Sequence, residues 1–460
     1  MPQNKLIENL KNILPENAIL VDNDILEKYS EDKSTIYKNK PSVVIRPDNI
    51  EEIRKVLKFA ATHKIPVICW GQGTSVTGSC LAFSDRSIIL SLEKFNKILE
   101  IDTKNLIAVV EPGVIVADLK AEAEKHNLFY PPDPASFESS TIGGNVATGA
   151  GGSSAVKFGV TKDYITGLEV LLSTGEILNL GGKIVKKSSG YNLIDLFVSS
   201  EGTLGIITKI FLKLLPKPEN ISTLYVTFSN MLPLLNGVNK ILYSSILPIS
   251  LEYIDDTALY YLNEKFNLPD KEVAKASLII EIEYNTTEQK DSLIMKLYNI
   301  LSNIEGFLNF YPLDNPAKAR EIWQARRSIG EIFRENFKYI GKADIVVPRG
   351  NILETINRIK LLAKEYNILV SCFGHAGDGN IHVNFLIKNE NFNKNILQNL
   401  YKIVKEMKGL PSGEHGIGVL KKDILKRFLD KKEIELMKKI KQIFDPYNIL
   451  NPGKIFDMEE

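Results

Sequence analysis

The chain has few cysteines and no long hydrophobic run, and each absence excludes a class of protein. Its 460 residues include three cysteines, too few and too scattered for a disulfide framework, and no Cys-x-x-Cys pair is present to hold an iron–sulfur cluster. No apolar run approaches the roughly 18 residues that span a bilayer, and charged residues interrupt the first apolar positions, unlike in a signal peptide. We therefore expect a cytoplasmic protein in a reducing compartment, with docking on a membrane through a partner left open.

A charge excess of either sign is also missing. The 57 Lys and Arg residues balance 56 Asp and Glu residues, for a formal net charge of +1. Without a basic excess or a polybasic block, neither a nucleic acid nor a membrane surface is indicated as a partner. The content of 44% hydrophobic and 25% charged residues is that of an ordinary globular protein, and the length predicts two or three domains.

The first half of the chain predicts short strands that alternate with helices. Asp48 is predicted as the N-cap of a helix that runs to His63, because Glu51 three residues later completes a capping-box pattern. Residues 131–154 have no period and are rich in Pro, Gly, Ser and Thr, which predicts a functional loop without secondary structure. Strands are predicted at residues 42–45, 66–69, 87–90, 106–110, 168–173 and 205–215, and a further helix at residues 114–125.

The order of elements changes after residues 215–218, where Leu-Pro-Lys-Pro predicts an extended linker. Beyond it strands alternate with helices, an order typical of an α+β domain whose sheet is covered on one face. The C-terminal residues predict a charged helix followed by a turn-rich stretch at residues 444–454. Strands of the second half are predicted at residues 223–228, 250–254, 277–284, 370–373 and 381–385.

Three glycine-rich stretches in the first half indicate a phosphate-binding site. Residues 71–78 follow a predicted strand, and residues 141–152 and 201–205 add further small residues whose amides can approach and bind an anion. The first stretch carries Val76 where a dinucleotide fingerprint needs its third glycine, so it is not of the Rossmann type. No Gly-Lys-Ser/Thr is present for a P-loop. The alternative is that the three stretches are unrelated turns.

Three of the five histidines, His375, His382 and His415, lie on glycine-rich loops, and Glu414 directly precedes the last of them. Two imidazoles and a carboxylate with an open position are typical of catalytic zinc, and the same ligands suit manganese or iron. Adjacent residues of an extended loop point apart, so His415 is predicted as a general base beside the metal-binding Glu414. The alternatives are that His415 is a third ligand and no separate base exists, or that the histidines only satisfy loop backbone groups.

Together these motifs resemble those of the vanillyl-alcohol-oxidase/PCMH-type flavoproteins, over about residues 40–456. The second half resembles one branch, which contains the glycolate oxidase FAD subunit, D-lactate dehydrogenases and D-2-hydroxyglutarate dehydrogenase. The resemblance is carried by residues 41–47, 71–78, 131–134, 143–145 and 200–205 in the first half and by residues 374–384, 412–416 and 451–454 in the second.

The resemblance implies an α+β fold with a PCMH-type FAD-binding domain of two subdomains. An α+β cap domain with an antiparallel sheet would supply the substrate pocket, and a C-terminal helical segment would return to the FAD domain. The implied division is an N-terminal helical segment at residues 1–38, the FAD-binding domain at 39–218, the cap domain at 219–415 and the C-terminal segment at 416–460.

The resemblance also implies FAD as the cofactor. Relatives that bind the flavin covalently use a histidine in the first glycine loop, and this loop has none, so non-covalent FAD is expected. Family members often carry Arg where this chain has Trp70. The implied cofactor-binding residues are Gly71, Gln72, Gly73, Thr74, Ser75, Gly78, Pro131, Asp133, Ser140, Thr141, Gly143, Gly144, Asn145, Glu201, Ile206, Ile207 and Asn451.

For the substrate, the resemblance implies that Arg326 and Lys342 bind a carboxylate, which a guanidinium fork suits better than an ammonium group. Arg327 is the competing candidate if the region carries a one-residue offset. Asn384 is expected to contact the substrate, because it alternates to the same strand face as His382. The implied metal ligands are His375, His382 and Glu414, and the implied base is His415.

The resulting hypothesis is an FAD-dependent dehydrogenase that oxidises a D-2-hydroxyacid or glycolate to the 2-oxoacid by metal-assisted hydride transfer to flavin N5. The electrons are expected to pass to an iron–sulfur partner subunit, an electron-transfer flavoprotein or quinone, and a homo-oligomer stays open. Two alternatives remain: a non-catalytic FAD-binding subunit of a glycolate oxidase-like complex, and a metal hydrolase without flavin.

Overall fold

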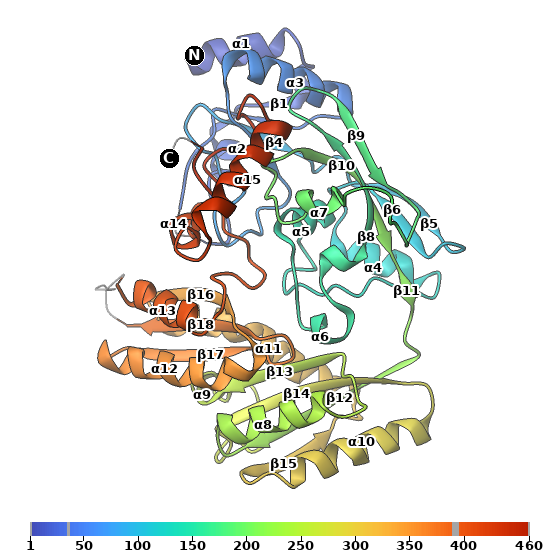
Figure 1. The fold of residues 1–460 in the computed structure, drawn as a ribbon, viewed down its shortest axis with the longest axis vertical. Helices are drawn as coiled ribbons and strands as arrows, with labels where there is room; N and C mark the ends of the chain where they lie inside the picture. Colours follow the sequence, from blue (N-terminus) through green and yellow to red (C-terminus); the bar gives the residue numbers. More distant parts are fainter. Residues whose placement is uncertain (1, 35–36, 389–394, 459–460) are drawn as a thin grey trace. The chain divides into compact units, whose positions relative to one another are not determined.

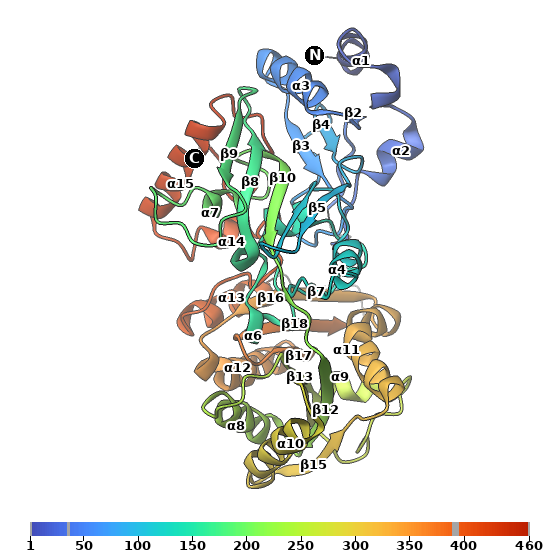
Figure 2. The ribbon, with the colours of Figure 1, turned by 90° about the vertical axis from the view of Figure 1, so that its right-hand side faces the viewer.

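The computed structural model describes residues 2–34, 37–388 and 395–458, and its fold is drawn in Figures 1 and 2. The chain divides into two compact units. The first unit consists of residues 1–150, 160–217 and 414–460, and the second of residues 151–159 and 218–413. The four segments expected from the sequence, with boundaries at residues 38, 218 and 415, stay a prediction.

The first sheet of the first unit is mostly parallel. Its strand order is β1-β2-β4-β3, in which β1 is antiparallel to β2 and the other neighbours are parallel. The strands are β1 (Ile19–Leu20), β2 (Val43–Ile45), β3 (Val67–Trp70) and β4 (Ile88–Ser91). The helices are α1 (Gln3–Lys11), η1 (Glu16–Ala18), α2 (Asn23–Lys28) and α3 (Ile50–His63), and the apolar side of α3 packs into the same core as these strands.

Helix α3 begins one residue later than the sequence predicts. The N-cap is Asn49, whose side-chain oxygen accepts a hydrogen bond from the Glu52 amide at 3.1 Å. A second bond runs from the amide of Asp48, the residue before the cap, to the Glu52 carboxylate at 2.9 Å. The capping pattern fits two registers, and Glu52 rather than Glu51 makes the return contact, so the predicted cap at Asp48 is wrong.

The second sheet of the first unit is antiparallel throughout, in the order β5-β6-β10-β8-β9. Its strands are β5 (Ile98–Asp102), β6 (Ile107–Val110), β8 (Ile165–Leu171), β9 (Ile177–Gly181) and β10 (Ile206–Lys213). A separate pair joins β7 (Leu128–Phe129) to β11 (Leu215–Pro216), so the first half of the predicted linker lies in a strand. The helices are α4 (Val116–Glu124), α5 (Ile142–Thr148), η2 (Thr161–Tyr164), α7 (Ile194–Phe197), α14 (Lys422–Leu425) and α15 (Lys431–Phe444).

The predicted structureless loop at residues 131–154 contains helix α5. Thr141 caps this helix, because its Oγ1 accepts a hydrogen bond from the Gly144 amide at 3.1 Å. Gly149 ends the helix with a φ of 67°, a left-handed conformation that favours glycine. The first turn contains two glycines and lacks the apolar period by which a helix is recognised in a sequence, so the prediction of a loop is wrong here.

The C-terminal segment returns to the first unit through buried polar contacts. The Lys441 ammonium of α15 donates to the carbonyls of Thr203 and Leu450, at 2.9 and 3.0 Å, and to Asp445 at 2.8 Å. Asp445 in turn accepts from the Leu450 amide at 2.8 Å. Leu450 forms a short parallel bridge with Val67 of β3. The tail is therefore attached to the first sheet by hydrogen bonds as well as by packing.

The second unit is built on one antiparallel sheet with the strand order β15-β12-β14-β13-β17-β18-β16. Its strands are β12 (Asn220–Phe228), β13 (Ser250–Asp255), β14 (Ala276–Tyr284), β15 (Phe307–Pro312), β16 (Tyr339–Val346), β17 (Leu369–His375) and β18 (Asn380–Ile387). The helices are α6 (Ala155–Phe158), α8 (Met231–Leu242), α9 (Asp256–Leu262), α10 (Thr287–Ser302), α11 (Pro316–Asn336), η3 (Arg349–Asn351), α12 (Ile352–Glu365) and α13 (Asn395–Glu406).

Helices cover both faces of this sheet, not one face as the sequence predicts. Figure 2 shows α8, α10, α12 and α13 on one side of the strands and α9 and α11 on the other. Both faces of β12 are apolar and buried: Tyr225 packs with α9 and α11, and its neighbour Val226, which points to the other face, is also fully buried. A strand that is buried on both faces loses the alternation of apolar and polar residues that distinguishes a covered face from an open one.

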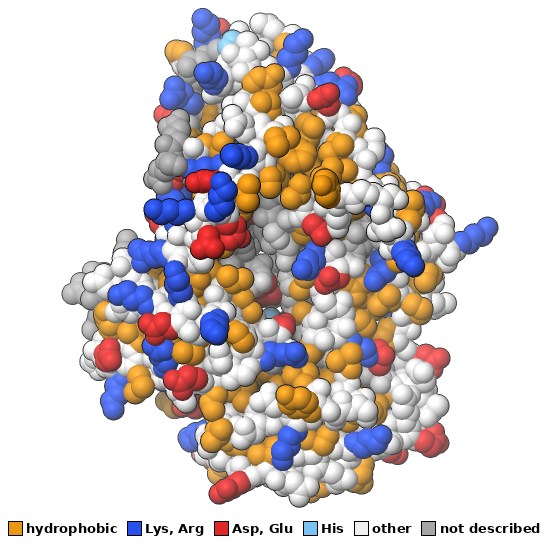
Figure 3. All heavy atoms as spheres, viewed as in Figure 1, with side chains coloured by type: hydrophobic (Ala, Val, Ile, Leu, Met, Phe, Trp, Pro, Cys, Tyr) orange, Lys and Arg blue, Asp and Glu red, His pale blue; other side chains and the backbone are white. Residues whose placement is uncertain are grey.

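The surface carries charges of both signs. Figure 3 shows Lys and Arg side chains interspersed with Asp and Glu over the face in view, with hydrophobic side chains between them. This mixture agrees with the formal net charge of +1. Within residues 2–34, 37–388 and 395–458, no helix is long and apolar enough to cross a membrane.

Replacement of Lys441 by Met is expected to lower the free energy of unfolding by about 3 kcal/mol, because it leaves the buried Asp445 carboxylate without its cationic partner. Urea denaturation measures this change. The matched control is Lys439→Met at an exposed position of the same helix, which should alter the free energy of unfolding by less than about 0.5 kcal/mol. Equal effects of the two substitutions would show that the buried contacts of Lys441 add nothing.

Candidate active site

Four neighbouring strands of the second unit bring polar residues to one face of their sheet. His375 of β17 lies opposite Glu252 of β13, and His382 of β18 lies opposite Asp344 of β16. Phe373 connects the two pairs, because it lies opposite His382 and two residues before His375. Residues directly opposite each other in paired strands share a face, and so do residues two apart in one strand. The backbone register therefore places both histidines and both carboxylates on the face that α9 and α11 cover.

Glu252 lies on the same face, and the sequence predicts no role for it. Its side chain is 1% exposed, one carboxylate oxygen pairs with Nδ1 of His375, and the other lies 2.7 Å from Nη2 of Arg326. Burial by itself would raise the pKa of Glu252, but the neighbouring His375 and Arg326 outweigh it and hold the pKa below its ordinary value. A signal was present, since a glutamate interrupts the otherwise apolar run Ser250–Ile254, but only its cross-strand partners identify its role.

The structure distinguishes the two competing arginines. Arg326 is 9% exposed, and its guanidinium carbon lies 4.7 Å from the centre of the Phe373 ring. Its Nε has no hydrogen-bond partner among the described residues, so a buried donor is available for a ligand. Arg327 is exposed and stacks on Trp323 at 5.7 Å instead. Of the two, Arg326 lies with the histidines.

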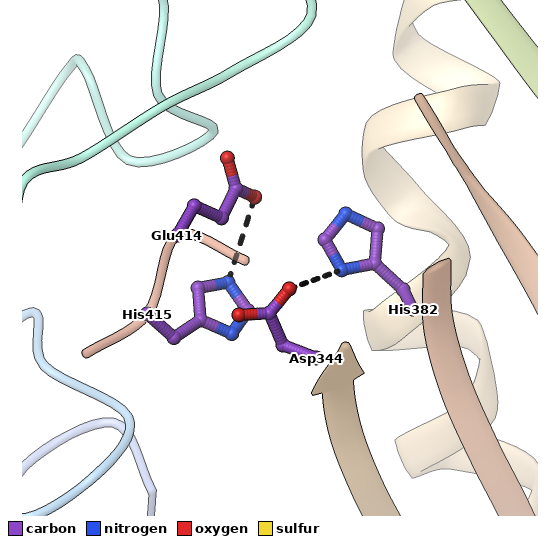
Figure 4. Close-up of side chains that lie close together, drawn as sticks. All are labelled: Asp344, His382, Glu414 and His415. Carbon is purple, nitrogen blue, oxygen red and sulfur yellow. Dashed lines mark ion pairs between the residues drawn. The ribbon is translucent and has the colours of Figure 1, made fainter. Parts of the chain in front are cut away.

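Asp344 is a second buried carboxylate, 2% exposed, and it organises the neighbourhood of His382. Its Oδ1 accepts a hydrogen bond from the Asn380 side-chain amide at 2.7 Å and lies 3.8 Å from Nδ1 of His382. Its Oδ2 accepts from the Ser412 hydroxyl at 3.2 Å and from the Gly413 amide at 3.0 Å. Figure 4 shows the Nδ1 side of the His382 ring turned to Asp344. Asp344 thus joins the sheet to the turn that precedes Glu414.

A tight turn at residues 375–380 brings the two histidines together. Gly379 has a φ of 93°, and a side chain there would meet the Val347 carbonyl oxygen at 2.1 Å, so only glycine fits. The ring centres of His375 and His382 lie 5.3 Å apart, with an angle of 86° between the ring planes. Two imidazoles at this separation can both bind to the same ligand.

Glu414 and His415 are the first residues of the chain after Gly413, and they belong to the first unit. Their side chains form an ion pair, with His415 Nε2 at 3.7 Å from a Glu414 oxygen, and Figure 4 draws this pair. The His415 carbonyl accepts a hydrogen bond from the Thr77 hydroxyl of the first glycine loop at 3.4 Å. Gly413 donates its amide to the Asp344 carboxylate, and Glu414 is the next residue of the chain.

Lys342 and Asn384 lie opposite each other on β16 and β18. They share the sheet face of His382, because Asn384 follows it by two residues. Asn384 is buried, whereas the Lys342 side chain is exposed. Desolvation by the surrounding chain lowers the pKa of Lys342, and the charge of Arg334 acts in the same direction.

Two of the glycine loops in the first unit pack directly against each other. A side chain at Gly71 would meet the Thr141 hydroxyl at 2.6 Å, and Gly78, with a φ of 75°, donates its amide to Asp32 at 2.8 Å. Beside this contact, Ser140 Oγ and Asn145 Nδ2 are buried without a hydrogen-bond partner in the part of the chain that the structure describes. Buried polar atoms of this kind fit a polar ligand such as a dinucleotide.

Glu201 and Asn451 are close together but use their side chains mainly within the protein. The Glu201 carboxylate accepts from the amides of Ile417 and Gly418 at 2.6 and 2.8 Å, and burial raises its pKa against the effect of these bonds. Asn451 donates to the carbonyls of Ser79 and Glu201 at 2.8 and 2.6 Å. These bonds connect the tail to the glycine loops, so both residues organise the loops that the sequence assigns to FAD.

The other residues assigned to FAD are spread over the first unit. Asp133 is paired with Lys120 at 2.6 Å, and Pro131 lies two residues before it. Ile206 and Ile207 begin β10 and are buried. The remaining members belong to the two glycine loops: Gln72, Gly73, Thr74, Ser75, Gly143 and Gly144.

Comparisons with known protein families show the class to which the chain belongs. A family profile described as an FAD binding domain matches residues 41–181, and one described as the C-terminal domain of FAD linked oxidases matches residues 217–455, a little over half of the chain. The chain therefore belongs to the FAD-linked oxidases, and it is an FAD-linked oxidoreductase with the PCMH-type fold expected from the sequence.

Within that family the chain is similar to several curated proteins over nearly its whole length. It is 38% identical to the glycolate oxidase subunit GlcD of Bacillus subtilis, over 93% of this chain and 92% of the relative. It is 35% identical to D-lactate dehydrogenase of Anaerostipes hadrus, over 98% and 97% of the two chains. It is 30% identical to D-2-hydroxyglutarate dehydrogenase of Stutzerimonas stutzeri, over 98% of each.

Solved structures with the same fold are more distant in sequence. p-Cresol methylhydroxylase matches with a TM-score of 0.81 at 19% identity, over 99% of this chain and 97% of the other. Alkyldihydroxyacetonephosphate synthase matches with a TM-score of 0.77 at 20% identity, over 97% and 85% of the two chains. At this identity the likeness shows the fold alone.

The pH dependence of the free energy of unfolding tests the lowered pKa of the buried Lys454. Its ammonium group donates to the Leu81 carbonyl at 2.8 Å, and burial lowers its pKa to about 8. Between that value and the unfolded pKa of about 10.4, the unfolded chain binds more protons than the folded chain, so stability rises with pH. The free energy of unfolding, relative to Lys454→Met, should therefore increase by about 2 kcal/mol from about pH 8 to about pH 10.

Urea denaturation of both proteins at the two pH values measures this difference. Lys439→Met, at an exposed position, serves as the control. Its free energy of unfolding should differ from that of the unsubstituted protein by the same amount at both pH values. A pH-independent difference for Lys454→Met would contradict a lowered pKa at this position.

Proposed function

We propose that the chain is an FAD-dependent dehydrogenase that oxidises a D-2-hydroxyacid or glycolate to the 2-oxoacid. The observation that carries the proposal is the buried arginine beside two histidines on one face of the sheet: Arg326, His375 and His382. An arginine guanidinium can bind the carboxylate of a small substrate, and two imidazoles beside it suit an adjacent hydroxyl. The names of the relatives, glycolate oxidase subunit, D-lactate dehydrogenase and D-2-hydroxyglutarate dehydrogenase, support the same substrate class.

Arg326 is proposed to bind the substrate carboxylate, with Lys342 as a second cationic contact and Asn384 as a hydrogen-bonding contact. Glu252 uses one guanidinium nitrogen of Arg326 and Phe373 supports its plane, so the side chain is held in one orientation. The buried Nε then remains a donor for the substrate. Holding the donor in place before the substrate binds reduces the loss of conformational entropy on binding.

His375 and His382 are proposed to hold a divalent metal together with Glu414. The donor set fits, because two imidazole rings 5.3 Å apart each turn Nδ1 to a buried carboxylate. Nitrogen and carboxylate ligands suit zinc, manganese or iron. A bound metal would supply Lewis acidity that lowers the pKa of the substrate hydroxyl.

His415 is proposed as the general base that takes the proton of that hydroxyl at an imidazole nitrogen. Its neighbour Glu414 lies within ion-pair distance of Nε2 and would stabilise the imidazolium that forms. In the competing role, His415 is a further metal ligand, and the site then has no separate base.

FAD is proposed to bind non-covalently to the first unit. The unpartnered Ser140 and Asn145 and the glycine amides at Gly71, Gly73 and Gly78 would hold its phosphates, and Asn451 would approach it from the tail. Bound FAD would supply the hydride acceptor, flavin N5. The corresponding division into an FAD-binding domain at residues 39–218, a cap domain at 219–415 and flanking segments at 1–38 and 416–460 belongs to this proposal.

Reduced flavin needs an electron acceptor, and the three scattered cysteines do not supply a cluster. We propose a partner that receives the electrons: an iron–sulfur subunit, an electron-transfer flavoprotein or quinone. The same proposal includes docking on the inner face of a membrane through such a partner. Self-association into a homo-oligomer stays part of the same proposal.

The visible spectrum of the purified protein tests the function directly. The flavin bands should be present and should bleach without oxygen when D-lactate, D-2-hydroxyglutarate or glycolate is added, because hydride transfer reduces FAD. L-lactate serves as the control. A yellow protein that no 2-hydroxyacid bleaches would indicate a non-catalytic FAD-binding subunit, and a colourless protein that cannot be reconstituted with FAD would contradict the proposal.

Replacement of His415 by Ala should reduce the rate of flavin reduction about 10²- to 10⁴-fold, the range for loss of a general base. Stopped-flow absorbance measures the rate, and bound FAD and metal should stay unchanged. The matched control is His126→Ala, another solvent-accessible histidine of the first unit. Reduction at the normal rate would exclude His415 as the base, and loss of metal would identify it as a ligand.

A further inference from the structure

Two buried carboxylates of the second unit are neither metal ligands nor substrate contacts in the proposed function. Glu252 of β13 and Asp344 of β16 have side chains that are 1% and 2% exposed. Burial of a carboxylate is unfavourable unless it is paired and hydrogen-bonded. Each of the two faces Nδ1 of one histidine: Glu252 is hydrogen-bonded to Nδ1 of His375, and Asp344 lies at ion-pair distance, 3.8 Å, from Nδ1 of His382. A buried carboxylate therefore stands on the Nδ1 side of both imidazoles.

The strand register fixes these contacts. Glu252 is directly opposite His375 in the β13–β17 pair, and Asp344 is directly opposite His382 in the β16–β18 pair. Opposite residues of paired strands are held by the backbone hydrogen bonds on both sides. The carboxylates are consequently placed by the sheet itself and not by a loop that could move away.

The remaining bonds of Asp344 leave it little freedom. Asn380 donates to Oδ1, and the Ser412 hydroxyl and Gly413 amide donate to Oδ2. A side chain at Gly413 would meet the Asn380 amide nitrogen at 2.0 Å, so only glycine at this position lets the turn come close enough to bond Asp344. Glu252 is held in the same way by Arg326, whose Nη2 lies 2.7 Å from its second oxygen.

A carboxylate at Nδ1 decides which imidazole nitrogen carries the proton. A neutral imidazole has one N–H: the hydrogen bond to Glu252 keeps that proton on Nδ1 of His375, and the negative charge of Asp344, 3.8 Å from Nδ1 of His382, favours the same form there. The lone pair then lies on Nε2, the nitrogen that can ligate a metal. With both histidines in this tautomer and their ring centres 5.3 Å apart, two nitrogen ligands are prepared before any metal binds.

We propose that Glu252 and Asp344 are positioning residues that hold His375 and His382 in the Nδ1-protonated form, so that both ligate a metal through Nε2. This inference rests on the metal site of the proposed function. It adds that each carboxylate connects its histidine to a second part of the site. Glu252 connects His375 to Arg326, and Asp344 connects His382 to the turn that leads into Glu414.

Zinc affinity tests the positioning role. Glu252→Gln and Asp344→Asn keep the side-chain shape but remove the charge, and each should weaken Zn²⁺ binding about 10- to 100-fold. Competition with a chromophoric chelator measures the affinity on the full-length flavoprotein, without substrate. The matched control is Asp255→Asn: this carboxylate is equally buried on β13 but accepts from Ser371 and Cys372 instead of a histidine ring. That variant should lose stability and keep its zinc affinity.

The ring tautomers are measured directly on the protein that keeps both carboxylates. The chain has five histidines, so selective ¹⁵N-histidine labelling gives few NMR signals, assigned by His375→Ala and His382→Ala. The unsubstituted zinc-bound protein should show both rings protonated at Nδ1 and ligated at Nε2. Ligation through Nδ1, or unchanged zinc affinity in both charge-removing variants, would overturn the inference.

The outcomes separate this inference from the proposed metal site. If His382→Ala binds Zn²⁺ as tightly as the unsubstituted protein, the metal site itself is wrong. If His382→Ala loses Zn²⁺ whereas Glu252→Gln and Asp344→Asn retain full affinity, the site stands and the positioning role fails. A variant that does not fold leaves the tautomer measurement on the unsubstituted protein to decide.

Discussion

The hydrogen-bonded register of β13, β17, β18 and β16 decides which side chains meet in the second unit. It pairs Glu252 with His375 and Asp344 with His382 across neighbouring strands, and a shift by one residue would turn these side chains to the opposite face. The tight turn at Gly379 and the packing of Arg326 on Phe373 both presuppose this register. The chemistry proposed for the chain depends on it in the same way.

The polar groups on this face add little net stability. Desolvation offsets much of the attraction in a buried ion pair such as Glu252 and Arg326, so its presence is weak evidence of a stabilising role. Stability comes instead from the apolar core between the sheet and helices α9 and α11, where Tyr225, Ile329 and Phe333 are buried. The core fixes the backbone, and the backbone in turn holds the charged groups where a ligand would meet them.

Much of the fold could be predicted from sequence, because its signals are local. Several strand positions and the helix that became α3 follow from apolar patterns and capping residues. Helix α5 could not be predicted, because its glycines hide the helical period, and its Thr141 cap is recognised only once Gly144 is seen to donate to it. The second covered face of the large sheet was missed for a related reason: strands buried on both sides carry no alternation.

The sequence by itself determined the residue types and local spacing of the candidate site: glycine-rich loops, the two histidines of one hairpin, and Glu414 next to His415. Only the tertiary structure shows that Arg326, and not Arg327, lies beside Glu252 and Phe373, because adjacent helix positions point about 100° apart and one of them faces the core. It alone revealed Glu252, which is 123 residues from His375 along the chain. Partners so distant in sequence meet through strand pairing, and local patterns do not encode which strands pair.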